Sequence, residues 1–183
     1  MVCLAKEEGI IQYPLLVNYG QRCFDEEYAA CKKVLAGLEI FPIQVMDLHG
    51  FGALISSSLT RTNLRISEDA FLPGRNLLFL LAGASYAYET SSNGVAIGLL
   101  SEDYHLFPDQ TREFAASAEQ TIQKAMGRSI KVITPLIEFA KKDVLRLAEM
   151  HGIVDTYSCH MGTSQPCGEC ISCREIINAR KEA

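Results

Sequence analysis

The chain has 183 residues, of which 48% are hydrophobic and 21% are charged, and its formal net charge is −5. This length supports one domain with a sizeable core, and the composition is that of an ordinary soluble globular protein. The absence of a basic block disfavours a surface for duplex nucleic acid, and no apolar run approaches the roughly 20 residues that span a bilayer. The start of the chain lacks the features of a signal peptide, so we expect a cytoplasmic location with reduced cysteines.

Predicted strands and helices alternate along the chain. Four short, almost continuously apolar runs are typical of parallel strands covered on both faces: 13–18, 40–46, 94–100 and 130–136. Four segments have helical periodicity: 25–38, 75–90, 111–126 and 141–152. The second of these is apolar nearly all round and predicts a buried helix. The alternation favours an α/β fold with a doubly wound parallel sheet.

Two segments depart from this alternation. Residues 54–74 are polar and aperiodic, which predicts a long loop of the kind found over active sites. Residues 2–9, VCLAKEEG, look like the last two turns of a helix, but neither a capping residue nor a strand precedes them. A doubly wound fold normally opens with a strand, a turn and then a helix. We therefore expect that this chain starts inside the first helix of such a fold.

Four of the seven cysteines share one stretch, with the spacing Cys159-x7-Cys167-x2-Cys170-x2-Cys173. Four thiolates at about 2.3 Å in a tetrahedron make a closed structural zinc site that leaves no position for water. Cys173 is expected to open a helix, whose N-terminal dipole favours a thiolate.

Three other interpretations of the cluster stay open. Disulfides are disfavoured by a reducing cytosol. An iron–sulfur cluster fits the C-x2-C-x2-C run, although the fourth cysteine lies upstream and no C-P follows. His160 is the third alternative as a ligand, weakened by the cysteine beside it.

Polar residues gather where predicted strands and helices meet. Arg75 and Asn76 stand at the start of the most apolar helix, where a polar pair is costly unless it is hydrogen-bonded or used. Glu102, Asp103 and Asp109 follow a strand, and such carboxylates suit a purine-like amine or Mg2+. The alternative is a solvated loop in which Asp109 caps the following helix.

Two further motifs carry weaker signals. Lys141 follows a strand and suits a phosphate as a point charge, although lysines at helix starts are common. In VNYGQR, a Tyr-Gly turn follows a strand end, which is where ligands bind in parallel sheets. Gly20 there would bring backbone close to a nucleotide and Arg22 would meet an anion, whereas the alternative is an ordinary turn.

Five motifs in order, NYGQR, PGRN, EDY…PD..REF, PLIEFAKKDV and SC…PCGECISC, resemble those of the 7-cyano-7-deazaguanine synthase family over about residues 2–174. That family is similar to the ATP pyrophosphatase (PP-loop) group. The resemblance implies a Rossmann-like nucleotide-binding α/β domain over residues 1–152 and a zinc-binding element over residues 153–183. It also makes a homodimer reasonable, with neither a membrane nor nucleic acid as a partner.

The resemblance implies a reaction. ATP, with Mg2+, activates the carboxylate of 7-carboxy-7-deazaguanine, ammonia gives an amide, and a second activation dehydrates it to 7-cyano-7-deazaguanine, a queuosine precursor. It implies one structural zinc held by Cys159, Cys167, Cys170 and Cys173. It implies base or nucleotide contacts at Arg75, Asn76, Glu102, Asp103 and Asp109, with Lys141 facing phosphate. No nucleophile is required, and no catalytic residue is assigned.

One family motif is missing from these residues, namely the Ser-Gly-Gly-x-Asp-Ser loop between the first strand and the first helix. That loop supplies the backbone N–H cradle for ATP phosphates. We therefore expect the chain as given to bind ATP poorly and to be an N-terminally shortened form of a longer protein. The alternative is a catalytically silent, zinc-stabilised relative that binds the deazapurine.

Overall fold

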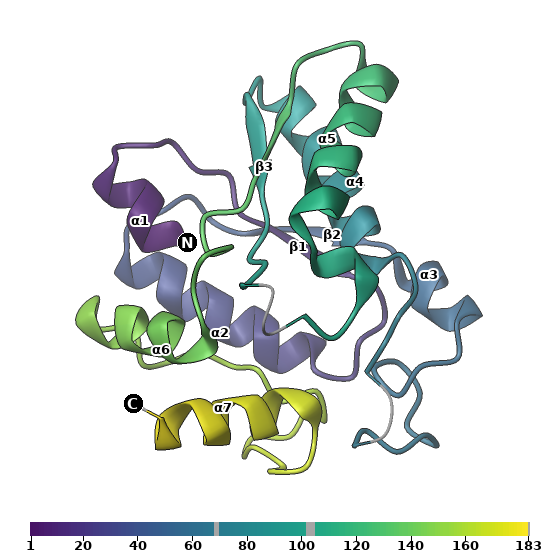
Figure 1. The fold of residues 1–183 in the computed structure, drawn as a ribbon, viewed down its shortest axis with the longest axis vertical. Helices are drawn as coiled ribbons and strands as arrows, with labels where there is room; N and C mark the ends of the chain where they lie inside the picture. The colour runs from purple at the N-terminus through teal and green to yellow at the C-terminus, as the bar shows by residue number, and fades with distance from the viewer. Residues whose placement is uncertain (68–69, 102–104, 183) are drawn as a thin grey trace. The chain divides into compact units, whose positions relative to one another are not determined.

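A computed structural model describes residues 1–67, 70–101 and 105–182 (Figure 1). The chain forms two compact units. The first unit comprises Met1–Leu15 and Gly74–Ala140, and the second comprises Leu16–Pro73 and Lys141–Ala183. The predicted division into a nucleotide-binding domain over residues 1–152 and a zinc-binding element over residues 153–183 stays a prediction. Among the described residues, no helix combines the length and the apolarity of a membrane span.

The structure contains an element in every segment where the sequence predicts one. The strands are β1 (Leu15–Asn18), β2 (Gln44–Asp47), β3 (Gly94–Ala96) and β4 (Lys131–Ile133). The longer helices are α2 (Phe24–Gly37), α4 (Arg75–Glu89), α5 (Arg112–Met126), α6 (Lys141–Met150) and α7 (Ile171–Lys181). Short helices are α1 (Val2–Glu7), α3 (His49–Leu54) and the 3-10 helix η2 (Pro108–Gln110). The mixed α/β fold class is confirmed.

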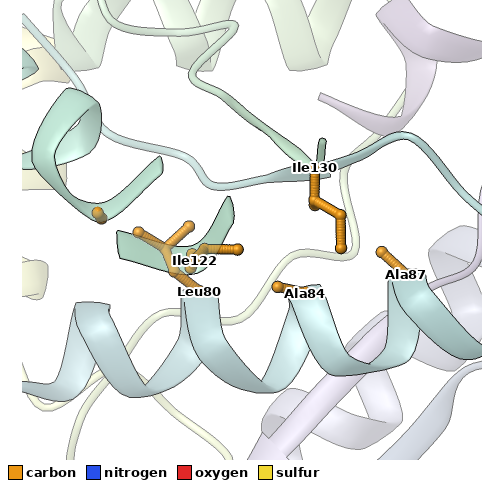
Figure 2. Close-up of a cluster of buried hydrophobic side chains, with 6 residues drawn as sticks. Leu80, Ala84, Ala87, Ile122 and Ile130 are labelled. Atoms are coloured by element: carbon orange, nitrogen blue, oxygen red, sulfur yellow. The ribbon is translucent and has the colours of Figure 1, made fainter. Parts of the chain in front are cut away.

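The first unit is built around the parallel pair of β3 and β4, in which Val95 lies opposite Val132. Helices α4 and α5 pack on this pair and on each other. Their contact buries a cluster of small and branched side chains (Figure 2): Leu80, Ala84, Ala87, Ala118, Ile122 and Ile130. Small alanines on α4 let the helix approach the strands closely, and the larger side chains fill the remaining space.

The apolar composition of helix α4 predicts that it is buried on all sides, but the structure exposes one of its faces. One face carries the buried residues Leu80, Ala84 and Ala87, whereas Leu77, Leu81 and Tyr88 on the other face are 43–52% exposed. The expectation of a wholly buried helix is therefore wrong, because apolar composition alone does not say how many faces of a helix find a neighbour.

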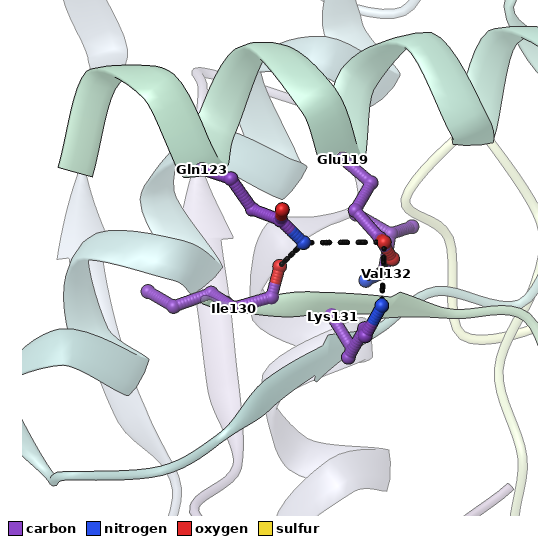
Figure 3. A network of polar contacts seen from close by, with 5 residues as sticks. All are labelled: Glu119, Gln123, Ile130, Lys131 and Val132. Carbon is purple, nitrogen blue, oxygen red and sulfur yellow. Dashed lines mark hydrogen bonds and ion pairs between the residues drawn. The ribbon is translucent and has the colours of Figure 1, made fainter. Parts of the chain in front are cut away.

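The outer edge of β4 is occupied by two side chains of α5 rather than by another strand (Figure 3). Glu119 Oε2 accepts the backbone N–H of Val132 at 2.8 Å, and Gln123 donates to the carbonyl of Ile130 at 3.4 Å. Gln123 and Lys131 also donate to Glu119 Oε1, at 3.2 and 3.1 Å. Residues one turn apart on the helix thus satisfy the donor and the acceptor that a further strand would use.

The second unit contains the two-stranded sheet of β1 and β2 and the paired helices α6 and α7. Two ion pairs tie these helices together, Lys141–Glu175 at 4.0 Å and Lys142–Glu182 at 3.9 Å. The described residues between α3 and α4 form the predicted loop, and a turn at residues 57–60 within it is deeply buried. Leu59 is 1% exposed, and the amides of Thr60 and Arg61 both donate to the Ser57 carbonyl.

Candidate functional site

The four cysteines of the C-terminal stretch come together in the second unit. Their Sγ atoms all lie within 4.8 Å of one another, and those of Cys167 and Cys173 are 3.9 Å apart. A tetrahedral site with zinc–sulfur distances of about 2.3 Å has sulfur–sulfur edges of about 3.8 Å. The donor set therefore fits one tetrahedral metal ion. Cys159, Cys170 and Cys173 are buried, as is usual for a closed structural site.

Backbone amides of the stretch point at the sulfurs. Cys167 donates to Cys159 Sγ at 3.4 Å, Cys170 to Cys167 Sγ at 3.3 Å, and Cys173 to Cys170 Sγ at 3.4 Å. These bonds soften the negative charge that metal-bound thiolates carry. The sequence predicts that helix α7 begins at Cys173. In the structure Cys170 is the N-cap of α7, and the helix begins at Ile171.

The pKa values of the thiols in the cluster differ from one another. Burial raises the pKa of Cys170, and it raises the pKa of Cys173 to about 12. Burial acts in the same direction on Cys159, but amides of Cys167 and Met161 and the neighbouring thiols outweigh it and bring the pKa of Cys159 to about 7. Four thiolates in this space without a positive charge would repel one another. The cluster therefore suits a divalent metal ion.

Two predicted site residues, Asn76 and Asp109, are joined in the first unit. Asn76 Nδ2 donates to the Asp109 carbonyl at 2.9 Å, and the Asn76 amide donates to Asp109 Oδ2 at 3.4 Å. Asp109 therefore caps the start of α4 from 33 positions further along the chain. The alternative in which Asp109 caps its own following helix is wrong, since Thr111 Oγ1 accepts the amide of Phe114 at the start of α5.

The other predicted contacts are placed separately. The Arg75 guanidinium lies 6.0 Å from the centre of the Phe79 ring. Lys141 lies in the second unit and faces Glu175. Glu102 and Asp103 lie outside the described residues. The base and nucleotide contacts of all these residues stay predictions.

Sequence reasoning missed Gln21, which orders the turn after β1. It is 5% exposed, and its Oε1 accepts the amide of Tyr19 at 2.9 Å. Its Nε2 donates to the Val17 carbonyl and to Glu27 Oε2, both at 3.1 Å. A glutamine between a glycine and an arginine looks like a solvent residue, and only its burial reveals this role.

The glycine of the same turn is required by its backbone conformation. Gly20 has φ +85°, its amide donates to Asn18 Oδ1 at 3.0 Å, and the exposed His49 ring lies 3.3 Å from where a Cβ would stand. A side chain here would be strained and crowded, so the turn after β1 requires glycine. Gly20 therefore leaves the backbone of this turn uncovered by a side chain of its own.

Comparison with known proteins finds a family model and several relatives that match this chain. The family model described as "Queuosine biosynthesis protein QueC" matches residues 1–183. A relative from Oceanobacillus iheyensis, named 7-cyano-7-deazaguanine synthase, is 31% identical over 192 residues, covering 98% of this chain and 86% of the relative. A protein of the same name from Sulfurihydrogenibium sp. is 35% identical over 190 residues, covering 93% of this chain and 83% of that protein.

Proposed function

The chain belongs to the QueC family of queuosine biosynthesis proteins, and from this we propose that it acts as a 7-cyano-7-deazaguanine synthase. The observation that carries the proposal is the match over residues 1–183, together with relatives of that name aligned along nearly the whole chain. The proposed reaction is a ligation that forms carbon–nitrogen bonds. It uses ATP and ammonia to convert 7-carboxy-7-deazaguanine into 7-cyano-7-deazaguanine.

The proposed reaction requires little covalent chemistry from the side chains of the protein. ATP adenylates the carboxylate with loss of pyrophosphate, and ammonia displaces AMP to give the amide. A second adenylation lets the amide oxygen leave with AMP, which leaves the nitrile. The protein aligns the reactants and neutralises phosphate charge. We assign the contacts to Arg75, Asn76, Asp109 and Lys141, and to Glu102 and Asp103. The hydrogen bond between the buried Asn76 and the partly buried Asp109 supports this, because it gives the start of α4 a rigid polar surface.

The cysteine cluster is proposed to hold one structural zinc. Four cysteine sulfurs leave no open coordination position, so the metal would stabilise the fold rather than activate water. Elemental analysis is expected to give about one zinc per chain in a colourless protein. A brown protein with an iron–sulfur absorption band would contradict zinc and favour the iron–sulfur alternative.

The test of function uses protein expressed from the complete reading frame that contains these residues. It is incubated with 7-carboxy-7-deazaguanine, ATP, Mg2+ and ammonium, and the products are followed by mass spectrometry. We expect the amide and then the nitrile, and neither when ATP or ammonium is left out. If no nitrile forms under conditions in which a known synthase of this family is active, the proposal is wrong.

A second candidate is a silent relative that binds the deazapurine without turnover. Calorimetric titration of the same protein with 7-carboxy-7-deazaguanine separates the two candidates. Binding without product, in protein from the complete reading frame, would assign the silent role.

We also propose that the protein is a homodimer and that it is located in the cytoplasm. The exposed apolar side chains of α4, Leu77, Leu81 and Tyr88, support self-association, because contacts between copies commonly bury such residues. Light scattering at several protein concentrations tests this, and a mass equal to one chain throughout would contradict it.

A further inference from the structure

The cysteine loop (residues 159–170) packs against the β1 loop (residues 19–23) within the second unit. The two loops are about 140 positions apart in the sequence, and they meet at Gly162 and Arg22. A Cβ added to Gly162 would lie 2.2 Å from the carbonyl oxygen of Arg22, 2.8 Å from its carbonyl carbon and 3.2 Å from Cys23 Cα. All three neighbours are backbone atoms that cannot rotate away, so this approach is possible only for glycine.

Arg22 is held from its other side by the buried turn at residues 57–60. Its backbone amide donates to the Leu59 carbonyl at 2.9 Å, and its guanidinium Nη1 donates to the Ser58 carbonyl at 3.4 Å. Ser58 and Leu59 are 0% and 1% exposed, so this side of the contact is part of the core. The backbone of Arg22 therefore lies between a fixed turn and the cysteine loop.

Met161 adds a contact from the same side as Gly162. Its Sδ lies 2.6 Å from Arg22 Nη2. A thioether is a weak acceptor, so this contact orients the guanidinium more than it stabilises the fold.

The positions of Met161 and Gly162 depend on the metal ligands. They follow Cys159 directly after His160, and the amide of Gly162 reaches the Cys159 carbonyl at 3.5 Å. The amide of Met161 is hydrogen-bonded to the Cys159 thiol. Closing four sulfurs on one ion fixes Cys159 and with it these two residues.

We propose that Met161 and Gly162 are positioning residues for Arg22, so that metal binding at the four cysteines orders the β1 loop. The carboxyl end of a strand in an α/β sheet is where ligands commonly bind, and the β1 loop stands at such an end. The metal would then order the β1 loop as well as stabilise the C-terminal segment. The inference does not depend on the reaction proposed above, because its readouts are structural.

The test compares Gly162→Ala with Gly168→Ala. Both glycines have a left-handed backbone, with φ +72° and +76°, but nothing lies within 4 Å of a Cβ at Gly168. The two variants therefore share the backbone strain and differ in the contact with Arg22. Hydrogen exchange is measured on peptides covering residues 19–23 and 57–60, alongside the metal content of each protein.

We expect exchange in these peptides to rise by about tenfold in Gly162→Ala and to stay at the wild-type level in Gly168→Ala. Both variants should retain one metal ion. Equal protection in the two variants would overturn the proposal.

A second measurement keeps the proposal testable if Gly162→Ala does not fold. Chelation of the metal from the wild-type protein should raise exchange in residues 19–23, and adding zinc back should restore it. Met161→Leu should also raise it, whereas Met161→Gln, which offers a carbonyl oxygen to the guanidinium, should recover most of the protection. If the metal leaves and exchange in residues 19–23 does not change, the cysteine loop does not position Arg22.

Discussion

At the residue scale, the Cys170 thiol is one of the four that could together hold a metal ion. It is fully buried, its sulfur accepts the amide of Cys173, and it caps α7. One atom is therefore a candidate metal ligand, a cap of the helix start and part of the core. A substitution that keeps the volume of the side chain but removes the thiolate should separate metal binding from packing in the core.

Cys170→Ser is expected to lose the bound metal and to lower the melting temperature. A serine hydroxyl is a poor zinc ligand, and metal binding contributes directly to the free energy of folding. Cys31→Ser is the matched control, because Cys31 is a partly buried thiol on α2 outside the cluster. Metal content and thermal unfolding are measured on both. A Cys170→Ser protein that is folded and fully metal-loaded would remove Cys170 from the ligand set.

The raised pKa values of Cys170 and Cys173 predict that metal binding releases protons. At pH 8 both groups are protonated in the metal-free cluster, because burial raises each pKa above its ordinary value. Binding as thiolates must then release about two protons from these groups, and affinity must fall as the pH is lowered. Calorimetry in buffers of different ionisation enthalpy measures the total number of protons that the four thiols release, to which these two contribute. A binding heat that is independent of the buffer would contradict the prediction.

At the element scale, α4 depends on a cap from far along the chain. Asp109→Ala is expected to destabilise the protein by about 1 kcal/mol, because the amide at the start of α4 loses its acceptor. Asp109→Asn keeps an acceptor and should retain most of this stability. Urea unfolding checks both variants, with Asp155→Ala, at an exposed position, as the control. Equal loss in Asp109→Asn would mean that charge rather than capping is what stabilises α4.

The same pair of variants separates the cap from the proposed substrate contact. Because Asp109→Asn preserves the helix, any loss of deazapurine binding in it reports the carboxylate itself. Unchanged binding in a stable Asp109→Asn protein would leave Asp109 a purely structural residue.

The contact of α5 with the edge of β4 predicts a pH effect. The Val132 amide, and after it Lys131, lower the pKa of the Glu119 carboxyl below its ordinary value. The carboxylate therefore adds stability above the ordinary carboxyl pKa, and this contribution disappears as pH falls through the lowered value. Glu119→Gln should reduce the unfolding free energy at pH 7 and flatten its decline in acid. Glu89→Gln, an exposed change on α4, should keep the wild-type profile.

The sequence predicts these elements to different degrees. Helices α2, α4 and α5 are recognisable because their periodicity is local, and the cysteine cluster because its ligand spacing has a chemical meaning. The short α3 and the buried turn at 57–60 are missed, because burial by distant segments orders them rather than their own pattern. The cap from Asp109 to α4 is missed for the same reason, and so is the contact between Gly162 and Arg22. Only the folded chain brings such partners together.

At the scale of the whole molecule, the two units rely on different stabilising interactions. The first unit buries an apolar cluster between α4, α5 and the parallel strands. The second collects segments from both halves of the chain around the cysteines and the Arg22 contact. We therefore expect two different sensitivities within one chain, one to cavities and one to loss of metal.

Ile122→Ala and metal chelation should expose these sensitivities separately. Ile122 is 2% exposed within the apolar cluster, and truncating such a side chain costs about 2–5 kcal/mol through lost contacts and a cavity. Hydrogen exchange should therefore rise in α4 and α5 of Ile122→Ala while the metal stays bound. Gln120→Ala, at an exposed position on α5, should change little. Chelation of the wild-type protein should instead raise exchange around residues 19–23 and 159–173 and spare α5. If either treatment raised exchange equally in both units, the chain would unfold as one cooperative body. Independent stabilisation requires that a change in one unit leaves hydrogen exchange in the other unit unaltered.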